Sequence, residues 1–157
     1  MLAWFIATAV LTIHFVFTDP RFDYRLLVVG AALPSVSDLI GGWMAVLGSV
    51  TVSVATLTVL MLATPGRRPI RATLLGLPIG MFLHLVFGAS WADTTVFWWP
   101  FTGVDLSDAG PALAARGWWA VPLEALGVAG CVWIVRRARL ADPERRAAFL
   151  STGRLEL

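Results

Sequence analysis

The chain contains 157 residues, which is the length of a single domain. Hydrophobic residues make up 58% of it and its mean hydropathy is +0.78, against roughly 45–50% apolar residues in soluble domains. Its twelve basic residues are all arginine, and its formal net charge is only +2. This composition argues against a soluble enzyme and against a nucleic-acid partner, and it predicts an integral membrane protein.

Five apolar stretches predict an all-α, polytopic membrane helix bundle. They cover residues 2–17, 26–47, 49–63, 74–91 and 118–135. A membrane-spanning helix needs roughly 20 apolar residues, so the first and third stretches are short by this measure. We expect one transmembrane domain over 1–135, in which 92–117 lies along the outer membrane surface, and then a basic cytoplasmic tail over 136–157.

The arginines predict the orientation of the chain in the membrane. With five spans, eleven of them fall on one face and only Arg116 falls on the other. Arginine concentrates on the cytoplasmic side of membrane proteins, so we expect the N-terminus outside and the C-terminus inside, in a bacterial plasma membrane. In a four-span alternative, 26–47 enters and leaves on the same side, which separates Arg21 and Arg25 from the other nine arginines of that face.

The tryptophans agree with this orientation, because their rings favour the headgroup level of a membrane. Trp133 alone lies near the predicted inner interface, and those near the outer one are Trp4, Trp43, Trp91, Trp98, Trp99, Trp118 and Trp119. The N-terminal stretch lacks a basic n-region and a small-residue cleavage site, so it is interpreted as a retained span. The expected partners are membrane lipids, and another membrane protein or a second copy of this chain. The basic tail either contacts anionic lipid or is ordinary topological charge.

Four ionisable side chains lie inside the apolar stretches, where a charge is costly unless it faces a partner, a cavity or a metal. They are His14, Asp38, His84 and Glu124. Counting about 1.5 Å per helical residue places Asp38, His84 and Glu124 in one layer of the outer half. His14 lies on the cytoplasmic side and needs only a hydroxyl or carbonyl partner.

Small residues share the helix face of His84, at the four-residue spacing that one face requires. They are Gly76, Gly80 and Gly88. Glycines on one face allow another helix to approach closely, so this pattern predicts that His84 points into the bundle and away from lipid.

The ionisable layer has two interpretations. Asp38 and His84, with Glu124 beside them, form either a metal or proton-relay site or a set of hydrogen bonds between helices. Asp93, just beyond the fourth apolar stretch, is either a carboxylate at the end of a helix or a polar rim of that site.

Two segments together resemble a known family. The segment 26–38, which contains Gly30 and ends in Leu33-Pro34-Ser35-Val36-Ser37-Asp38, resembles the G-x-L-L-P-D-x-x-D signature of small bacterial membrane-bound metal-dependent hydrolases. The run from Leu83-His84 to Gly88, followed by Trp98-Trp99-Pro100-Phe101, resembles that family's H-x-x-x-D helix and W-P-F segment. The family is similar to zinc-dependent phospholipase C-like proteins. The resemblance implies a divalent metal, zinc or manganese, held by helices, and hydrolysis of an ester or phosphoester.

The chain departs from the family pattern at metal-ligand positions. Ser35 and Gly88 stand where the pattern has aspartate, and Gly48 stands where it has histidine. Only Asp38 and His84 match as metal ligands, whereas catalytic zinc has three protein ligands.

The favoured hypothesis is therefore a non-catalytic member of the family that binds lipid or a partner. In the first alternative the chain is an active hydrolase acting from the outer leaflet. Asp38 and His84 then hold the metal, and Glu124 or Asp93 serves as a further ligand or as the catalytic base. A second alternative is a small transporter or channel component, which needs a continuous polar path across both leaflets.

Overall fold

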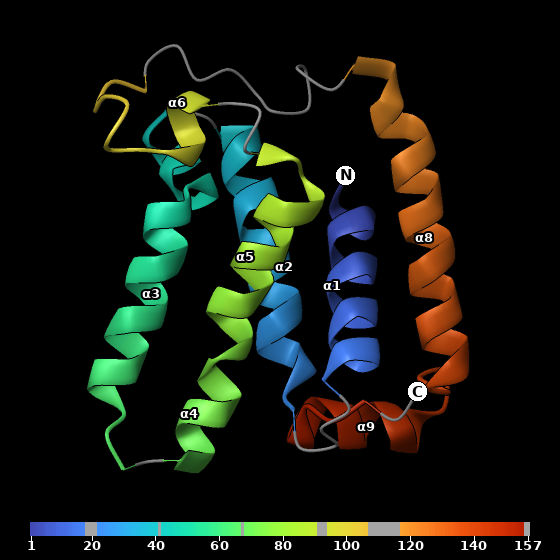
Figure 1. The fold of residues 1–157 in the computed structure, drawn as a ribbon. Helices are drawn as coiled ribbons and strands as arrows, with labels where there is room; N and C mark the ends of the chain where they lie inside the picture. Colours follow the sequence, from blue (N-terminus) through green and yellow to red (C-terminus); the bar gives the residue numbers. More distant parts are fainter. Residues whose placement is uncertain (18–21, 41, 67, 91–93, 107–116, 156–157) are drawn as a thin grey trace.

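The computed structural model of the chain describes residues 1–17, 22–40, 42–66, 68–90, 94–106 and 117–155 (Figure 1). These residues form helices and turns without a strand, which confirms the all-α prediction. Each predicted apolar stretch overlaps one main helix, although α2 begins two residues before its stretch and α8 ends two residues after its own. These helices are α1 (Leu2–Val16), α2 (Tyr24–Ile40), α3 (Val50–Ala63), α5 (Gly76–Phe87) and α8 (Ala120–Arg137).

Shorter helices connect the main ones. They are η1 (Gly42–Gly48) and η3 (Gly117–Trp119), both of the 3₁₀ type, and α4 (Arg68–Leu74), α6 (Thr94–Phe97) and α9 (Pro143–Thr152). Figure 1 shows the five main helices side by side, alternating in direction along the chain, with α9 across one end. We call that end the base of the bundle; η3 and α6 lie at the opposite end.

The predicted stretches 26–47 and 74–91 are not continuous helices. α2 ends at Ile40 and the backbone continues as η1, because glycine destabilises an α-helix by about 1 kcal/mol relative to alanine and η1 begins with Gly42. α4 and α5 are separated at Leu75, because Pro78 has no backbone N–H to bond the carbonyl four residues earlier.

α2 and α5 pack backbone against backbone through glycine. A Cβ on Gly80 would lie only 2.7 Å from the backbone nitrogen of Ala31, and a Cβ on Gly76 would lie 2.9 Å from that of Leu27. Neither contact leaves room for a side chain, so the glycines set the helix spacing. The predicted small-residue face of α5 is thus confirmed as an interhelical contact.

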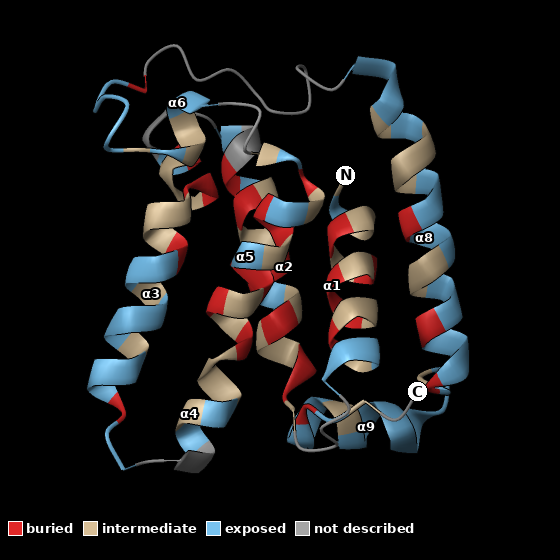
Figure 2. Ribbon diagram, viewed as in Figure 1, coloured by how far each residue is buried: buried red, intermediate tan, exposed pale blue. Residues whose placement is uncertain are grey.

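The core lies where α1, α2 and α5 meet, as the buried residues in Figure 2 show. Phe5, Leu27 and Leu85 are almost fully buried there. The outer faces of α3 and α8 are instead exposed; Leu62 on α3 is 75% exposed and Val121 on α8 is 72% exposed. The structure therefore has a buried centre and an apolar outer surface.

Within the described residues, two helical segments are long and apolar enough to cross a membrane, by length and composition. They are Ile70–Phe87, which includes part of α4 and all of α5, and Gly117–Arg137, which joins η3 and α8. The apolar helices Leu2–Val16, Tyr24–Ser37 and Val50–Ala63 are shorter. At 1.5 Å per residue, the 15 residues of α1 extend about 22 Å, against a hydrocarbon thickness of about 30 Å.

Candidate functional site

His84 is buried inside the bundle, as its helix face predicts, with only 2% of its surface exposed. Its Nδ1 lies 3.0 Å from the backbone carbonyl oxygen of Ala31 on α2. Because a carbonyl oxygen only accepts hydrogen bonds, Nδ1 carries the proton and Nε2 presents a lone pair in the neutral ring. The imidazole also packs on the ring of Phe5 from α1, with 3.8 Å between ring centroids. His84 thus joins α5 to both α2 and α1.

The hydroxyl groups near this layer behave in two ways. Ser49 accepts a hydrogen bond from the backbone N–H of Val52 and caps the start of α3, and Ser53 donates to the carbonyl of Ser49. Ser35, one turn beyond Ala31 on the same face of α2, has a buried Oγ that forms no hydrogen bond with the described residues. A buried hydroxyl without a partner is costly, so Ser35 is an unsatisfied polar group within the described part of this region.

Glu124 caps α1 from a different helix. Its carboxylate oxygens accept hydrogen bonds from the backbone N–H groups of Ala3, at 3.2 Å, and Trp4, at 3.3 Å. One oxygen also lies 3.7 Å from the N-terminal ammonium of Met1. The first N–H groups of a helix lack partners within it and favour a negative charge, so Glu124 on α8 supplies the cap that α1 lacks.

His84 and Glu124 are not brought together. The first turn of α1 separates them, because Phe5 packs on His84 whereas Ala3 and Trp4 contact Glu124. Figure 1 shows the same order of elements, with α1 between the α2–α5 pair and α8. The sequence predicted that the two side chains share one layer, but α1 lies between their helices and keeps them apart.

The remaining predicted site residues contribute no geometry. The backbone of Asp38 belongs to α2, but its side chain lies outside the described part of the structure, as does the whole of Asp93. His14, near the base of α1, makes an edge contact with the ring of Phe15. Among the described side chains, no group of three histidine, cysteine or acidic residues is placed to hold a metal ion.

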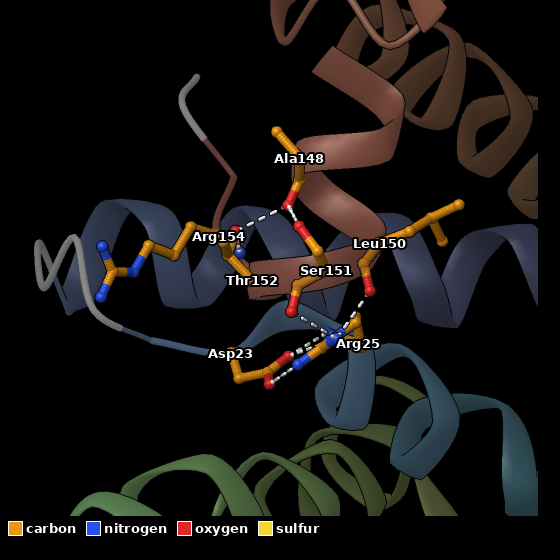
Figure 3. A network of polar contacts seen from close by, with 7 residues as sticks. All are labelled: Asp23, Arg25, Ala148, Leu150, Ser151, Thr152 and Arg154. Carbon is orange, nitrogen blue, oxygen red and sulfur yellow. Dashed lines mark hydrogen bonds and ion pairs between the residues drawn. The ribbon is translucent and has the colours of Figure 1, made fainter. Parts of the chain in front are cut away.

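A polar network that sequence reasoning missed lies at the base of the bundle (Figure 3). Asp23 accepts hydrogen bonds from Arg25 at three nitrogens: the backbone N and Nε, each at 3.0 Å, and Nη2 at 2.6 Å. Arg25 then donates through Nη1 to the carbonyls of Leu150, at 2.7 Å, and Ser151, at 3.2 Å. Those carbonyls end α9, so Arg25 binds the C-terminal turn of that helix to the start of α2.

Asp23 is almost fully buried, with 4% of its surface exposed. The Arg25 guanidinium bound to it lowers the pKa of the Asp23 carboxyl below its ordinary value of 3.8, although burial acts in the opposite direction. An aspartate just before a long apolar stretch is a recognised helix-start signal and identifies Asp23 as a cap. No local signal connects Arg25 with a helix 125 residues away.

Comparison with known proteins adds nothing to this geometry: no protein-family model, curated protein or solved structure matches the chain.

Proposed function

We propose that this chain is a five-span protein of the bacterial plasma membrane, with its N-terminus outside and its C-terminus inside. The exposed apolar faces of α3 and α8 support this placement, because contiguous exposed apolar surface marks a membrane or protein contact. The arginines at the base end of α8, Arg136 and Arg137, support a cytoplasmic base.

Hydroxyl groups within the apolar helices, and at the C-cap of α3, also support membrane placement. Thr8, Thr58 and Thr64 each donate to the carbonyl oxygen four residues earlier, at 2.7, 2.8 and 2.6 Å. These bonds satisfy the hydroxyls without water, which hydrocarbon cannot provide.

We further propose that the protein is a non-catalytic relative of the small bacterial membrane-bound metal-dependent hydrolases and that it acts by binding membrane lipid. The observation that best supports a non-catalytic protein is that His84 and Glu124 both form contacts between helices. Each fastens its own set of helices, and α1 lies between them. Residues with such interhelical contacts have a structural role in the bundle. In addition, Ser35 and Gly88 stand where the family pattern has two acidic metal ligands.

One observation favours the alternative, an active hydrolase. The Nδ1–H of His84 points at a backbone carbonyl, which is the arrangement that metal-binding histidines use to orient Nε2 toward the ion. Asp38 is then the second ligand, and zinc or manganese is the metal that this pair suits.

Metal content separates the two proposals. The full chain is purified in detergent, and its zinc and manganese are measured by elemental mass spectrometry. Hydrolysis of bis(p-nitrophenyl) phosphate is followed on the same sample. A non-catalytic protein holds neither metal in stoichiometric amount and shows no turnover. A restored variant, Ser35→Asp/Gly48→His/Gly88→Asp, is expected to gain metal because it regains the ligands of the family pattern.

Stoichiometric metal in the unmodified chain, lost in His84→Ala, would overturn the non-catalytic proposal and favour the hydrolase. Metal in neither the unmodified nor the restored chain would count against the family resemblance itself. His84→Ala is checked for folding by tryptophan fluorescence, so that loss of metal is not confused with loss of structure.

A further inference from the structure

An open pocket lies at the base of the bundle, between the residues that follow α8 and the helix α9. Its volume is about 430 Å³. Apolar side chains and two arginines share its lining. The residues that line it are Ala138, Leu140, Glu144, Arg145, Ala148, Phe149, Thr152, Arg154 and Leu155.

The pocket has an apolar wall that belongs to the folded core. Phe149 and Leu155 are partly buried and pack against the core cluster formed by α1, α2 and Ile134 of α8. Ala138, at the end of α8, is 5% exposed. The wall is therefore fixed in place by the bundle, and it offers apolar surface to a bound molecule.

The α9 helix that forms the other side is also fixed. Arg25 binds its last carbonyls, and the backbone N–H of Tyr24 donates to the carbonyl oxygen of Gly153 at 2.8 Å. Asp142 caps its first turn by accepting from the N–H of Glu144 at 3.0 Å. The pocket is thus preformed between two anchored elements.

The charge of the described lining is net positive. Arg145 and Arg154 contribute two cations, and Glu144 contributes one opposing carboxylate. In Figure 3 the Arg154 side chain extends away from Asp23 and Arg25, so it does not belong to that ion pair. Arg136 and Arg137 end α8, Arg139 follows in the turn after it, and all three add to the positive potential on this side.

We propose that this pocket binds the phosphate headgroup of an anionic phospholipid from the inner leaflet. A guanidinium binds phosphate oxygens strongly and with a fixed geometry, and the apolar wall suits the first part of an acyl chain. Free phosphate shares the charge but has no use for the apolar wall, so the lipid is the occupant that matches both halves of the lining. The proposal deepens the lipid-binding function above and rests on it.

Binding is measured by isothermal titration calorimetry on the full chain in maltoside micelles. The probes are dioctanoyl phosphatidylglycerol, dioctanoyl phosphatidylcholine and inorganic phosphate. We expect saturable binding of phosphatidylglycerol, and at least tenfold weaker binding of phosphatidylcholine and of inorganic phosphate. Arg145→Gln/Arg154→Gln should weaken binding of phosphatidylglycerol about 30-fold, because two cations near the phosphate are lost.

The matched control is Arg136→Gln/Arg137→Gln, which removes the same charge next to the pocket but not from its lining. This control should change affinity by less than about threefold. Equal weakening in both double variants would overturn the pocket, because diffuse charge would then explain the binding. If inorganic phosphate bound as tightly as phosphatidylglycerol, the lipid proposal would be overturned and free phosphate would be the occupant of the pocket.

Two features keep the test decisive. The headgroup comparison uses the unmodified chain and needs no substitution. Equal affinity for phosphatidylglycerol and phosphatidylcholine therefore overturns the proposal even if the arginine variant fails to fold. Measurement in micelles depends neither on the number of membrane spans nor on metal content. Stoichiometric metal at His84 would therefore reject the non-catalytic proposal. It would not decide the lipid-pocket proposal, which is tested by the binding measurements alone.

Discussion

Individual polar side chains in this protein are held by specific partners, some in other elements and some nearby in the sequence. His84 bonds the Ala31 carbonyl and packs on Phe5, and Asp23 receives three hydrogen bonds from Arg25. A buried polar group that keeps its partner costs little, whereas the same group costs about 1–3 kcal/mol when the partner is lost. Substitution of one member of each pair therefore has a direct and measurable consequence.

The Asp23–Arg25 pair predicts an acid-labile stability. Because the folded pKa of Asp23 is lowered, the stability it supplies is fully present above its ordinary value of 3.8 and is lost as the pH falls through the folded value. Thermal unfolding in detergent, followed by tryptophan fluorescence, should therefore show a steeper loss of stability below pH 4 for the unmodified chain than for Asp23→Asn. Asp142→Asn, at an exposed helix cap, is the control, and an unchanged slope in Asp23→Asn contradicts the prediction.

Gly153 is required by both its backbone and its neighbour. Its φ of +72° is in the left-handed region, and a Cβ there would collide with the Asp23 carboxylate. Gly66 provides a matched control, since its φ is +74° and nothing lies within 4 Å of its Cβ position. Both alanine variants pay about 1–2 kcal/mol for the backbone. Gly153→Ala should lower the thermal stability further than Gly66→Ala does, because of the collision with Asp23. Equal losses of stability in the two variants would argue against the close packing of α9 on Asp23.

At the scale of elements, helices in this bundle complete one another. α1 has no side-chain cap of its own, and α8 provides Glu124 for its first N–H groups. α9 has its own N-cap in Asp142, but the carbonyls of its last turn bond Arg25 of α2. Both devices connect elements that are distant in the sequence, so each helix end depends on the assembled bundle.

The cap on α1 predicts a graded response at Glu124. Glu124→Ala leaves the N–H groups of Ala3 and Trp4 without their acceptor and should lower the free energy of unfolding by about 1–2 kcal/mol. Glu124→Gln keeps one amide oxygen and should lose less. Denaturant unfolding in micelles checks the order, with Val121→Ala as the control because that residue is 72% exposed on the same helix. Equal loss in the Gln and Ala variants would contradict the capping role.

For the whole molecule, the central question is how an apolar bundle with several short helices sits in a membrane. The alternating directions of α1, α2, α3, α5 and α8 suit five passes (Figure 1). α1 and α3 contain 15 and 14 residues, which requires local thinning of the bilayer or burial of their ends beneath neighbours. A two-pass arrangement, with only Ile70–Phe87 and Gly117–Arg137 across the membrane, places the turn between α2 and α3 on the cytoplasmic side.

That turn gives a decisive topology test. In a Cys131→Ala background, single cysteines replace Met44, Gly66 and Thr102 and are labelled with a membrane-impermeant maleimide on intact cells. Five passes predict that the cysteines at 44 and 102 label from outside, and that the one at 66 labels only after permeabilisation. Gly66 and Thr102 give the same result in both topologies and serve as controls. Protection of the cysteine at 44 would reject five passes.

Local sequence determined the helical elements of this protein. The five apolar stretches predicted the positions of the main helices, and the glycines at 76 and 80 predicted the face that carries His84 into the bundle. These features follow from the run length and the spacing of residue types, which act over one or a few helical turns. The breaks at Gly42 and Leu75 also have local causes, glycine and proline, but the length of an apolar stretch does not reveal them.

Only the tertiary structure decided which side chains meet. Depth along a helix placed His84 and Glu124 in one layer, but the position of α1 between α5 and α8 separates them. The contact of Arg25 with the end of α9 likewise joins residues 125 positions apart. The order of helices around a bundle arises from packing among all of them, which no single helix encodes. Composition therefore predicts the class of protein and its helices, whereas packing determines which partner each polar residue contacts.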